Sequence, residues 1–498
     1  MHFTIMTSFL DRSTPQDAEK HRLAWAVLPA DLHTPVRIFL ALRDAGRGPC
    51  LLESAEGPDR LARYSFFGID SDQVFKGSFS GASLETAEGK EDWEGACHDA
   101  FSEVLARMVA PPAPSHLPPF CGGWVGAFSY EWATTLEPRV PVPGNDPWGF
   151  PAAEFRRYPA VVALDHSSQR ILLVRDCPDG EAGFTSVQES LDSIASDLAR
   201  PALSTGSFRT LGEIKPAMDR GAYEEGVARI RHDITQGEIF QAVLSQRFDL
   251  DCEGDPFLLY RALRLTNPSP HMFYWEGEET TLVGSSPERL VSVLDGRIQN
   301  RPIAGTRARS EDPLEDERLA AELLGDTKER AEHDMLVDLA RNDLGRVART
   351  GTVSVREHSV IEKFARVQHL VSRVECDLAA GRGALDALAA CFPAGTVSGA
   401  PKVRAMEILA EIEKDARGPY AGAFGYVDRS GNLDMAITIR TFALKGNRLS
   451  FQAGAGVVFD SNPEREYEET LEKSGALVEA ATLAGSGDLE DSGQEGKP

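Results

Sequence analysis

The sequence predicts an α+β fold in which antiparallel sheets are flanked by helices. Short segments with alternating apolar and polar residues, typical of antiparallel strands, occur at 241–250, 280–296 and 447–460. Segments with helical apolar spacing lie between them without a regular strand–helix alternation. This irregular order favours an α+β fold over a doubly wound parallel sheet.

Two breaks in composition divide the 498 residues into an expected N-terminal domain (1–200) and a larger C-terminal domain (220–484). One break is the proline-rich run at 110–120, and the other is the segment 199–220, which lacks sustained helical or strand periodicity. The acidic segment 485–498 is rich in glycine and serine, and we expect it to be a disordered tail.

Charge and cysteine usage argue against several functional classes. The net charge of −25 would repel phosphate backbones, so nucleic acid and anionic membranes are poor partner candidates. No window approaches the roughly 18 consecutive apolar residues of a membrane span, and no secretory pattern opens the chain. The seven cysteines are scattered and never form a CxxC motif, which indicates reduced thiols. We therefore expect a cytoplasmic protein without a zinc site.

The first candidate for chemistry is a helix that Asp326 can cap, with Glu329 three residues later. Glu329 and Glu332 are one helical turn apart and therefore project to the same side.

A second acidic helix is expected to begin at Pro463, and it places Glu466, Glu469 and Lys473 on one face. If the two helices meet, their glutamates can surround a hard cation that prefers oxygen ligands, with Mg²⁺ the natural choice. Each pair taken alone is equally consistent with a solvated helix face, and periodicity does not show that the helices converge.

The segment CFPAGTVSGAPK (391–402) is a loop that runs into a helix. Its amides and the helix N-terminus can bind an anion, and Thr396 and Lys402 can add a hydroxyl and a charge. The alternative is an ordinary helix start that Ser398 caps.

Two strands raise similar alternatives. In 241–250, strand alternation places Gln241, Ser245 and Arg247 on one polar face, which either lines a site or is exposed to solvent. In 447–460, Gly454 and Gly456 indicate either close approach of a ligand or a bulge.

Together and in this order, these segments closely resemble the chorismate-utilising enzymes, and among them the large subunits of anthranilate synthases. The resemblance runs from residue 51 to 477, and its most specific blocks are NPSPHMFY, PIAGTR, EHDMLVDLARNDLGRV, HLVSRVE, CFPAGTVSGAPKVRAMEI and QAGAGVVFDS. It implies the fold of that family. It also implies conversion of chorismate and ammonia to anthranilate and pyruvate through 2-amino-2-deoxyisochorismate.

The resemblance assigns catalytic roles to Glu288, as the acid that helps to expel the C4 hydroxyl, to His369 beside the ring, and to Thr396. From the sequence pattern alone, His369 can equally be a core histidine. The resemblance also implies Mg²⁺, held by Glu332 and Glu469 with Glu329 and Glu466 close by. The other positions that it places around the substrate are Gln241, Ala304, Thr306, Lys402, Tyr420, Arg440, Gly454, Gly456 and Lys473.

Two of these positions bear on the nucleophile. In relatives that make 4-amino-4-deoxychorismate, the position of Ala304 resembles a lysine that attacks the ring. In isochorismate and salicylate synthases, the position of Gln241 is a lysine that activates water. Since neither residue is a lysine here, ammonia that adds at C2 is the expected nucleophile.

The resemblance further implies a partner and an inhibitor. The chain has no glutaminase motif, so we expect a separate glutamine amidotransferase subunit, component II. L-tryptophan is expected to bind as a feedback inhibitor between the domains, although the same segments can merely pack the interface. His271 departs from the tyrosine that is commoner there. The expected tryptophan residues are Leu52, Glu53, Ser54, Asn267, Pro268, Ser269, His271 and Met272.

Two other functions stay open at the level of sequence. A close relative can release 2-amino-2-deoxyisochorismate without eliminating pyruvate, and a catalytically dead paralogue can retain only regulation. His369 and Thr396 match the eliminating type, and intact Glu288, Glu332 and Glu469 argue against a dead paralogue.

Overall fold

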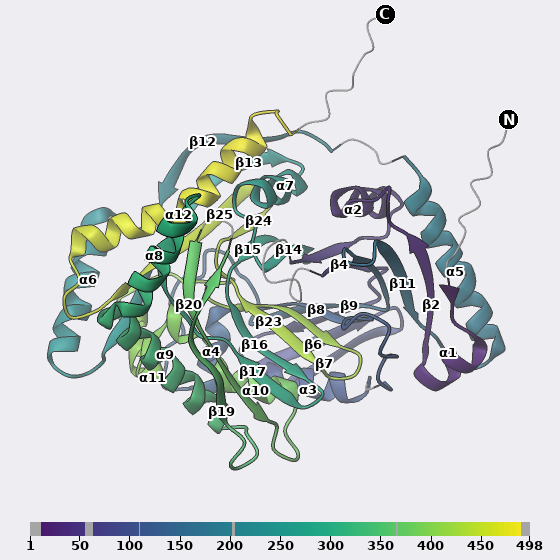
Figure 1. The fold of residues 1–498 in the computed structure, drawn as a ribbon, viewed down its shortest axis with the longest axis horizontal. Coiled ribbons are helices and arrows are strands. Elements are labelled where there is room, and N and C mark those ends of the chain that lie inside the picture. The colour runs from purple at the N-terminus through teal and green to yellow at the C-terminus, as the bar shows by residue number, and fades with distance from the viewer. Residues whose placement is uncertain (1–10, 55–62, 109, 202–204, 365–366, 490–498) are drawn as a thin grey trace, which may run out of the picture.

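The computed structural model describes residues 11–54, 63–108, 110–201, 205–364 and 367–489, and within them two large antiparallel sheets pack together with helices around them (Figure 1). Apolar side chains from both sheets, among them Trp275 and Val125, share one buried cluster between the layers. The predicted α+β class is confirmed.

The first sheet joins strands from both ends of the chain. The three segments expected to be strands all form strands, at 241–254, within 281–294 and at 448–457. In spatial order the first sheet contains β1 (Asp11–Arg12), β2 (Leu23–Pro29), β11 (Arg170–Asp176), β10 (Ala160–Asp165), β4 (Tyr64–Ile69), β3 (Cys50–Glu53), β14 (His271–Glu276), β15 (Thr281–Ser286), β24 (Thr441–Lys445), β25 (Arg448–Val457), β13 (Gln241–Gly254) and β12 (Phe208–Pro216), with the short β21 (Gly399–Ala400) on β13.

The second sheet is built in the same way and has the strand with Ala304 at one edge. In spatial order it contains β18 (Ile303–Ala308), β20 (Val367–Asp377), β17 (Arg297–Asn300), β16 (Arg289–Leu294), β23 (Leu433–Ile437), β22 (Ala423–Asp428), β8 (Gly123–Phe128), β9 (Ala153–Tyr158), β5 (Gln73–Gly77), β6 (Gly81–Thr86) and β7 (Gly89–Glu94), with β19 (Ser354–Lys363) on β20.

Helices cover the outer faces of the sheets. In Figure 1, α1 (Pro15–His21), α2 (Pro35–Asp44) and α5 (Glu181–Ala199) lie on one side of the molecule. On the other side lie α6 (Arg220–Thr235), α8 (Pro313–Gly325), α9 (Thr327–Gly345), α11 (Lys402–Ile412) and α12 (Pro463–Gly485). The remaining helices are α3 (Cys97–Ala106), α4 (Ala133–Leu136), α7 (Phe257–Thr266) and α10 (Ala384–Cys391), with short 3-10 turns at Tyr130–Trp132 and Gly395–Val397.

The boundary near residue 200 separates two chain segments that share both sheets. β3 pairs with β14 in the first sheet, and β8 pairs with β22 in the second. The division into 1–200 and 220–484 stays a prediction. Within the segment 199–220, which lacks sustained periodicity, 208–216 form the edge strand β12. In the expected tail, α12 ends at Gly485, and 490–498 lie outside the described residues.

Both acidic helices start where the sequence predicts. Asp326 accepts hydrogen bonds from the backbone N–H groups of Lys328 and Glu329 and so caps α9. Asn462 caps α12 in the same way, with Pro463 in the first turn. Local side-chain chemistry therefore determines where each glutamate pair begins.

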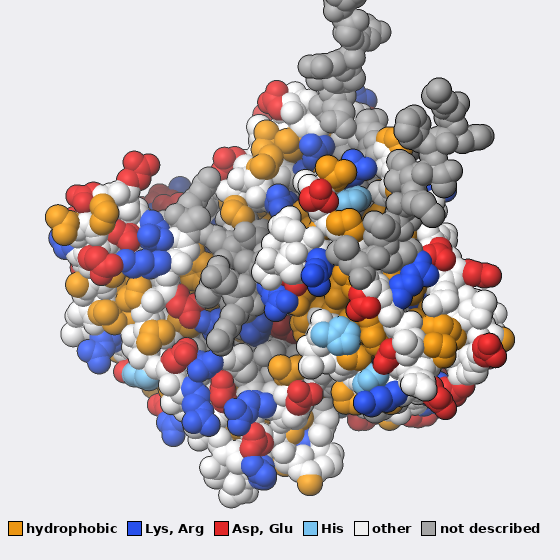
Figure 2. All heavy atoms as spheres, turned by 45° about the vertical axis from the view of Figure 1, so that its right-hand side comes forward, with side chains coloured by type: hydrophobic (Ala, Val, Ile, Leu, Met, Phe, Trp, Pro, Cys, Tyr) orange, Lys and Arg blue, Asp and Glu red, His pale blue; other side chains and the backbone are white. Residues whose placement is uncertain are grey.

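None of the described helices is long and apolar enough to cross a membrane. Acidic and basic side chains are interspersed over the face drawn in Figure 2.

A buried ion pair in the C-terminal segment is contacted by a glutamate from the N-terminal segment. Arg417 is about 1% exposed at its side chain and donates two hydrogen bonds to Glu413, at 2.6 and 2.7 Å. It also donates to the carbonyls of Val397 and Val243, at 2.7 and 2.8 Å. Glu131 from the N-terminal segment accepts from the Arg417 backbone N–H at 2.7 Å.

We expect Arg417→Met to lower the free energy of unfolding by about 3–5 kcal/mol, because Glu413 is left charged and buried without its cation. Urea denaturation measures the change. The matched control is Arg465→Met, since Arg465 pairs with Glu472 on the exposed face of α12 and such a pair contributes about 0–1 kcal/mol. Equal losses in the two variants would contradict the role given to Arg417.

Candidate active site

Glu288 lies in the turn between β15 and β16. Its Oε1 accepts a hydrogen bond from the Thr396 hydroxyl at 3.1 Å. Burial raises the pKa of Glu288 to about 7, while the Thr396 bond and the charge of Lys473 act in the opposite direction. A carboxyl group that titrates near neutral pH can deliver a proton as a general acid.

One cation, Lys473, acts on this carboxyl group, and a second, Arg440, binds the backbone of Lys473. Lys473 of α12 donates to the Gly454 carbonyl at 3.0 Å and pairs with Glu469 at 2.7 Å. Arg440 donates to the Lys473 carbonyl at 2.6 Å, and burial lowers the pKa of its guanidinium. Because an arginine stays protonated in proteins, the pair supplies positive charge to an anionic ligand within an acidic chain.

The two glycines of β25 lie where this strand packs closely against neighbouring side chains. A Cβ at Gly454 would come within 3.0 Å of the Tyr420 hydroxyl, and one at Gly456 would lie 3.6 Å from Nε2 of Gln241. The pairing of β13 with β25 is regular here, so the glycines form no bulge. Gln241 Oε1 is buried without a hydrogen-bond partner and can accept from an N–H donor.

His369 of β20 lies opposite Thr306 of β18. Its Nδ1 is 3.0 Å from the Gly305 carbonyl and 3.1 Å from the Thr306 hydroxyl. Since a carbonyl only accepts, Nδ1 carries a proton, which orients the ring. Ala304, two residues before Thr306 in β18, pairs with Leu370 and has only a methyl side chain.

The four glutamates of α9 and α12 influence one another across the gap between the helices. Burial raises the pKa of Glu332, and the charges of Glu329 and Glu469 raise it further. Burial also raises the pKa of Glu466, and Glu469 contributes in the same direction. The charge of Glu469 in α12 therefore acts on Glu332 in α9, so these two positions lie near each other.

The donor set fits a hard divalent cation that completes its coordination with other ligands. Within the described ranges, no three His, Cys, Asp or Glu side chains stand close enough to hold a metal by themselves. Arg307 lies 3.3 Å from Glu329 and Lys473 lies 2.7 Å from Glu469, which offsets part of the repulsion. Oxygen-only donors and repelling carboxylates are suited to Mg²⁺, which keeps waters and substrate oxygens as ligands.

The side chain of Lys402 binds other groups of the protein. Its Nζ donates to Asp343 and to the Cys391 carbonyl, both at 3.0 Å. The alternative of a Ser398 cap was wrong, because the Ser398 hydroxyl donates to the Ala394 carbonyl and α11 starts after Pro401 without a side-chain cap.

The polar face of β13 is buried, so its exposure to solvent was the wrong alternative. Ser245 and Arg247 are 2% and 8% exposed. The Ser245 hydroxyl donates to Glu413 at 2.9 Å, and Arg247 pairs with Asp415 at 2.9 Å.

Five of the expected tryptophan residues line a cavity of about 450 Å³ between the sheets. Met272 pairs directly with Glu53 across β14 and β3. The volume lies in the usual range of small-molecule sites. The five lining residues are Leu52, Glu53, Ser54, His271 and Met272.

The other three expected tryptophan residues are in the loop before β14. Ser269 Oγ is buried without a hydrogen-bond partner, and the Asn267 carbonyl accepts from Ser285. Pro268 lies between them. A second and larger groove, of about 1010 Å³, contains none of the expected site residues.

The sequence analysis did not identify three polar residues that lie near these sites. Arg307 belongs to the PIAGTR block and pairs with Glu329. Tyr260 and Arg264 of α7 both bind Glu53, at 2.5 and 2.9 Å. Their spacing of four residues on one helix is the signal that could have identified them.

The comparisons with known proteins agree with this geometry. A family model described as chorismate binding enzyme matches residues 53–479. "Anthranilate synthase component 1" of Methanothermobacter thermautotrophicus is 43% identical over 455 residues, which cover 91% of this chain and 93% of the relative. The protein of the same name from Thermus thermophilus is 43% identical over 469 residues, with 92% and 97% covered.

Solved structures agree as well. Anthranilate synthase component I from Streptococcus pneumoniae superposes with a TM-score of 0.75 at 37% identity, over 84% of this chain and 92% of that one. The menaquinone-specific isochorismate synthase of Escherichia coli shares the fold, with a TM-score of 0.68 at 18% identity over 92% and 94% of the chains. From the model match over most of its length and from these relatives, the chain belongs to the chorismate binding enzymes.

Proposed function

We propose that the chain is the chorismate-converting component of an anthranilate synthase, which forms anthranilate and pyruvate from chorismate and ammonia. The observation that carries the proposal is the Glu288–Thr396 pair, a protonatable carboxyl group on which the charge of Lys473 acts. The names of relatives at 43% identity support the same reaction.

In the first step, Glu288 gives its proton to the C4 hydroxyl, which leaves as water while ammonia adds at C2. Arg440, Lys473 and the backbone beside Gly454 bind the carboxylates of the substrate. Gln241 Oε1 accepts an N–H of the incoming ammonia. Holding both reactants in place converts a bimolecular step into an effectively unimolecular one.

In the second step, the C2 proton is lost and the bond between C3 and the enolpyruvyl oxygen breaks, which gives the aromatic ring and pyruvate. We assign assistance in this step to His369, whose ring the Gly305 carbonyl orients. Glu332 and Glu469 would hold Mg²⁺, with Glu329 and Glu466 nearby. When bound, the ion would neutralise the ring carboxylate and act as a Lewis acid.

The identity of the nucleophile tests the proposal. Purified chain incubated with chorismate, Mg²⁺ and ¹⁵N-ammonium should give ¹⁵N-anthranilate, and omission of ammonium should leave chorismate unchanged. Isochorismate formed without ammonium would show that water is the nucleophile and would contradict the reaction.

We further propose a glutamine amidotransferase subunit as the ammonia source, in accordance with the component 1 names of the relatives. L-tryptophan is the proposed ligand of the 450 Å³ cavity. Residues 1–200 and 220–484 would then form the two walls of that cavity. All seven cysteines are free and buried, as a reducing compartment allows, and we propose action in the cytoplasm.

The pH dependence of the rate follows from Glu288, because only its protonated form can donate a proton to the C4 hydroxyl. Since its pKa is raised to about 7, kcat/KM at constant free ammonia should be full below that pH. Above it, the rate should fall about tenfold per pH unit. Thr396→Val removes a bond that lowers this pKa, so the alkaline limb should move to higher pH. A limb that moves to lower pH would contradict the assignment.

A further inference from the structure

The residue that directly follows the turn carrying Glu288 forms part of the wall of the 450 Å³ cavity. Arg289, the next residue, lines that cavity together with Asp434 and Ala436 of β23. Glu288 itself binds Thr396 on the catalytic side. Glu288 at the candidate active site and Arg289 in the cavity wall are therefore consecutive residues.

β23 holds this turn at two points. The Ile437 N–H donates to the Glu288 carbonyl at 3.0 Å. The Arg289 guanidinium donates two hydrogen bonds to Asp434, both at 2.8 Å. The two side chains are 13% and 23% exposed, so the pair is largely shielded from water. A bidentate pair fixes direction as well as distance.

The other end of the turn is also connected to the cavity. His271, a cavity residue, lies opposite Ser286 where β14 pairs with β15. The Ser286 hydroxyl donates to the Glu288 carbonyl at 3.3 Å. The cavity lining therefore includes Arg289, directly after the turn, and His271, the strand partner of the residue directly before it.

We propose that Arg289 and Asp434 are positioning residues that hold Glu288 against Thr396, and that a ligand in the cavity lowers activity by displacing this pair. The inference rests on the proposed function, because it needs Glu288 to be the acid. A displacement of about 1 Å at a reacting group can cost about 100-fold in rate. Inhibition by this route needs no contact between ligand and substrate.

The test uses Asp434→Asn in the full chain, a change that keeps the side-chain shape and removes the charge. We expect kcat to fall about 10- to 100-fold. KM for chorismate should stay near its original value, since the groups that bind its carboxylates lie on other elements. Calorimetry should show that tryptophan still binds. The ratio of the rates with and without saturating tryptophan should approach one, because the coupling element is already disrupted.

The matched control is Asp176→Asn. Asp176 binds Arg157 at 2.6 Å and is 26% exposed, and it lines the other groove. Its kinetics and inhibition should stay unchanged. If Asp434→Asn does not fold, Arg289→Lys serves instead, because it keeps the charge and loses the bidentate geometry.

An Asp434→Asn variant with the kcat and the inhibition of the control would overturn the inference. A rise in KM with kcat unchanged would also overturn it, because that result places the pair in substrate binding. An inactive wild-type chain would overturn the proposed function and this inference with it. An active wild type with an unaffected variant overturns the inference alone.

Discussion

Glu288→Gln should reduce kcat about 10²- to 10⁴-fold, the usual contribution of a positioned general acid. Glutamine keeps the shape and can still bind the Thr396 hydroxyl, but it has no proton to give to the C4 hydroxyl. The KM for chorismate should change little. Anthranilate fluorescence measures the rate, and calorimetry of chorismate binding checks that the site is intact.

Glu276→Gln is the control for this loss. Glu276 ends the neighbouring strand β14, where its carboxylate accepts from the Tyr274 hydroxyl at 2.7 Å. It should retain full activity. Comparable rates in the two variants would remove Glu288 from the mechanism.

Glu332→Gln should abolish most of the Mg²⁺-dependent turnover. The raised pKa of Glu332 reflects burial and the neighbouring Glu329 and Glu469, and a cation would relieve that repulsion. We expect apparent Mg²⁺ affinity to fall about 10- to 100-fold, as happens when a group that supports a metal site is lost. Rates across a Mg²⁺ titration measure the shift. Mg²⁺-dependent thermal stabilisation gives a readout that does not depend on turnover.

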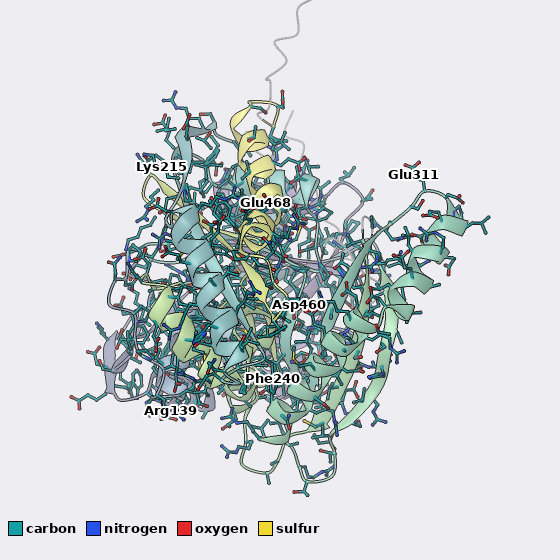
Figure 3. The ribbon with its side chains drawn as sticks, turned by 90° about the vertical axis from the view of Figure 1, so that its left-hand side faces the viewer. Arg139, Lys215, Phe240, Glu311, Asp460 and Glu468 are labelled. Atoms are coloured by element: carbon teal, nitrogen blue, oxygen red, sulfur yellow. The ribbon has the colours of Figure 1, made fainter. Side chains whose placement is uncertain are left out.

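Glu468→Gln provides the matched control on the same helix. Glu468 is labelled on α12 in Figure 3, and its side chain is 51% exposed. It lies 3.8 Å from Arg220 of α6, away from the other glutamates. Its Mg²⁺ dependence should be unchanged. Equal Mg²⁺ responses in Glu332→Gln and Glu468→Gln would contradict the metal assignment.

The sequence predicted the elements whose signals are local. The cap at Asp326, the helix start at Pro463 and the alternation in 241–250 depend on neighbours a few residues away, and the structure confirms them. β12 was missed because it is an edge strand with both faces largely exposed, so alternation was not imposed on it. Leu211 within it is 39% exposed.

Periodicity in the sequence does not predict contacts between segments that are distant along the chain. The convergence of Glu332 and Glu469, and the engagement of Lys402 by Asp343, each depend on two helices whose packing no local pattern encodes. The burial of Arg247 is a further case, because a polar strand face is buried only when a distant acid such as Asp415 reaches it. Where the sequence pattern alone gave no prediction, the resemblance to a known family predicted which residues form the site.

The most direct measurement is product analysis of the purified chain with chorismate, Mg²⁺ and ammonium at mildly alkaline pH. Chromatography should show anthranilate and pyruvate in equal amounts, with neither formed when Mg²⁺ is omitted. An aminated product that retains the pyruvate group, or chorismate left unchanged, would contradict the proposal that this chain completes the anthranilate synthase reaction.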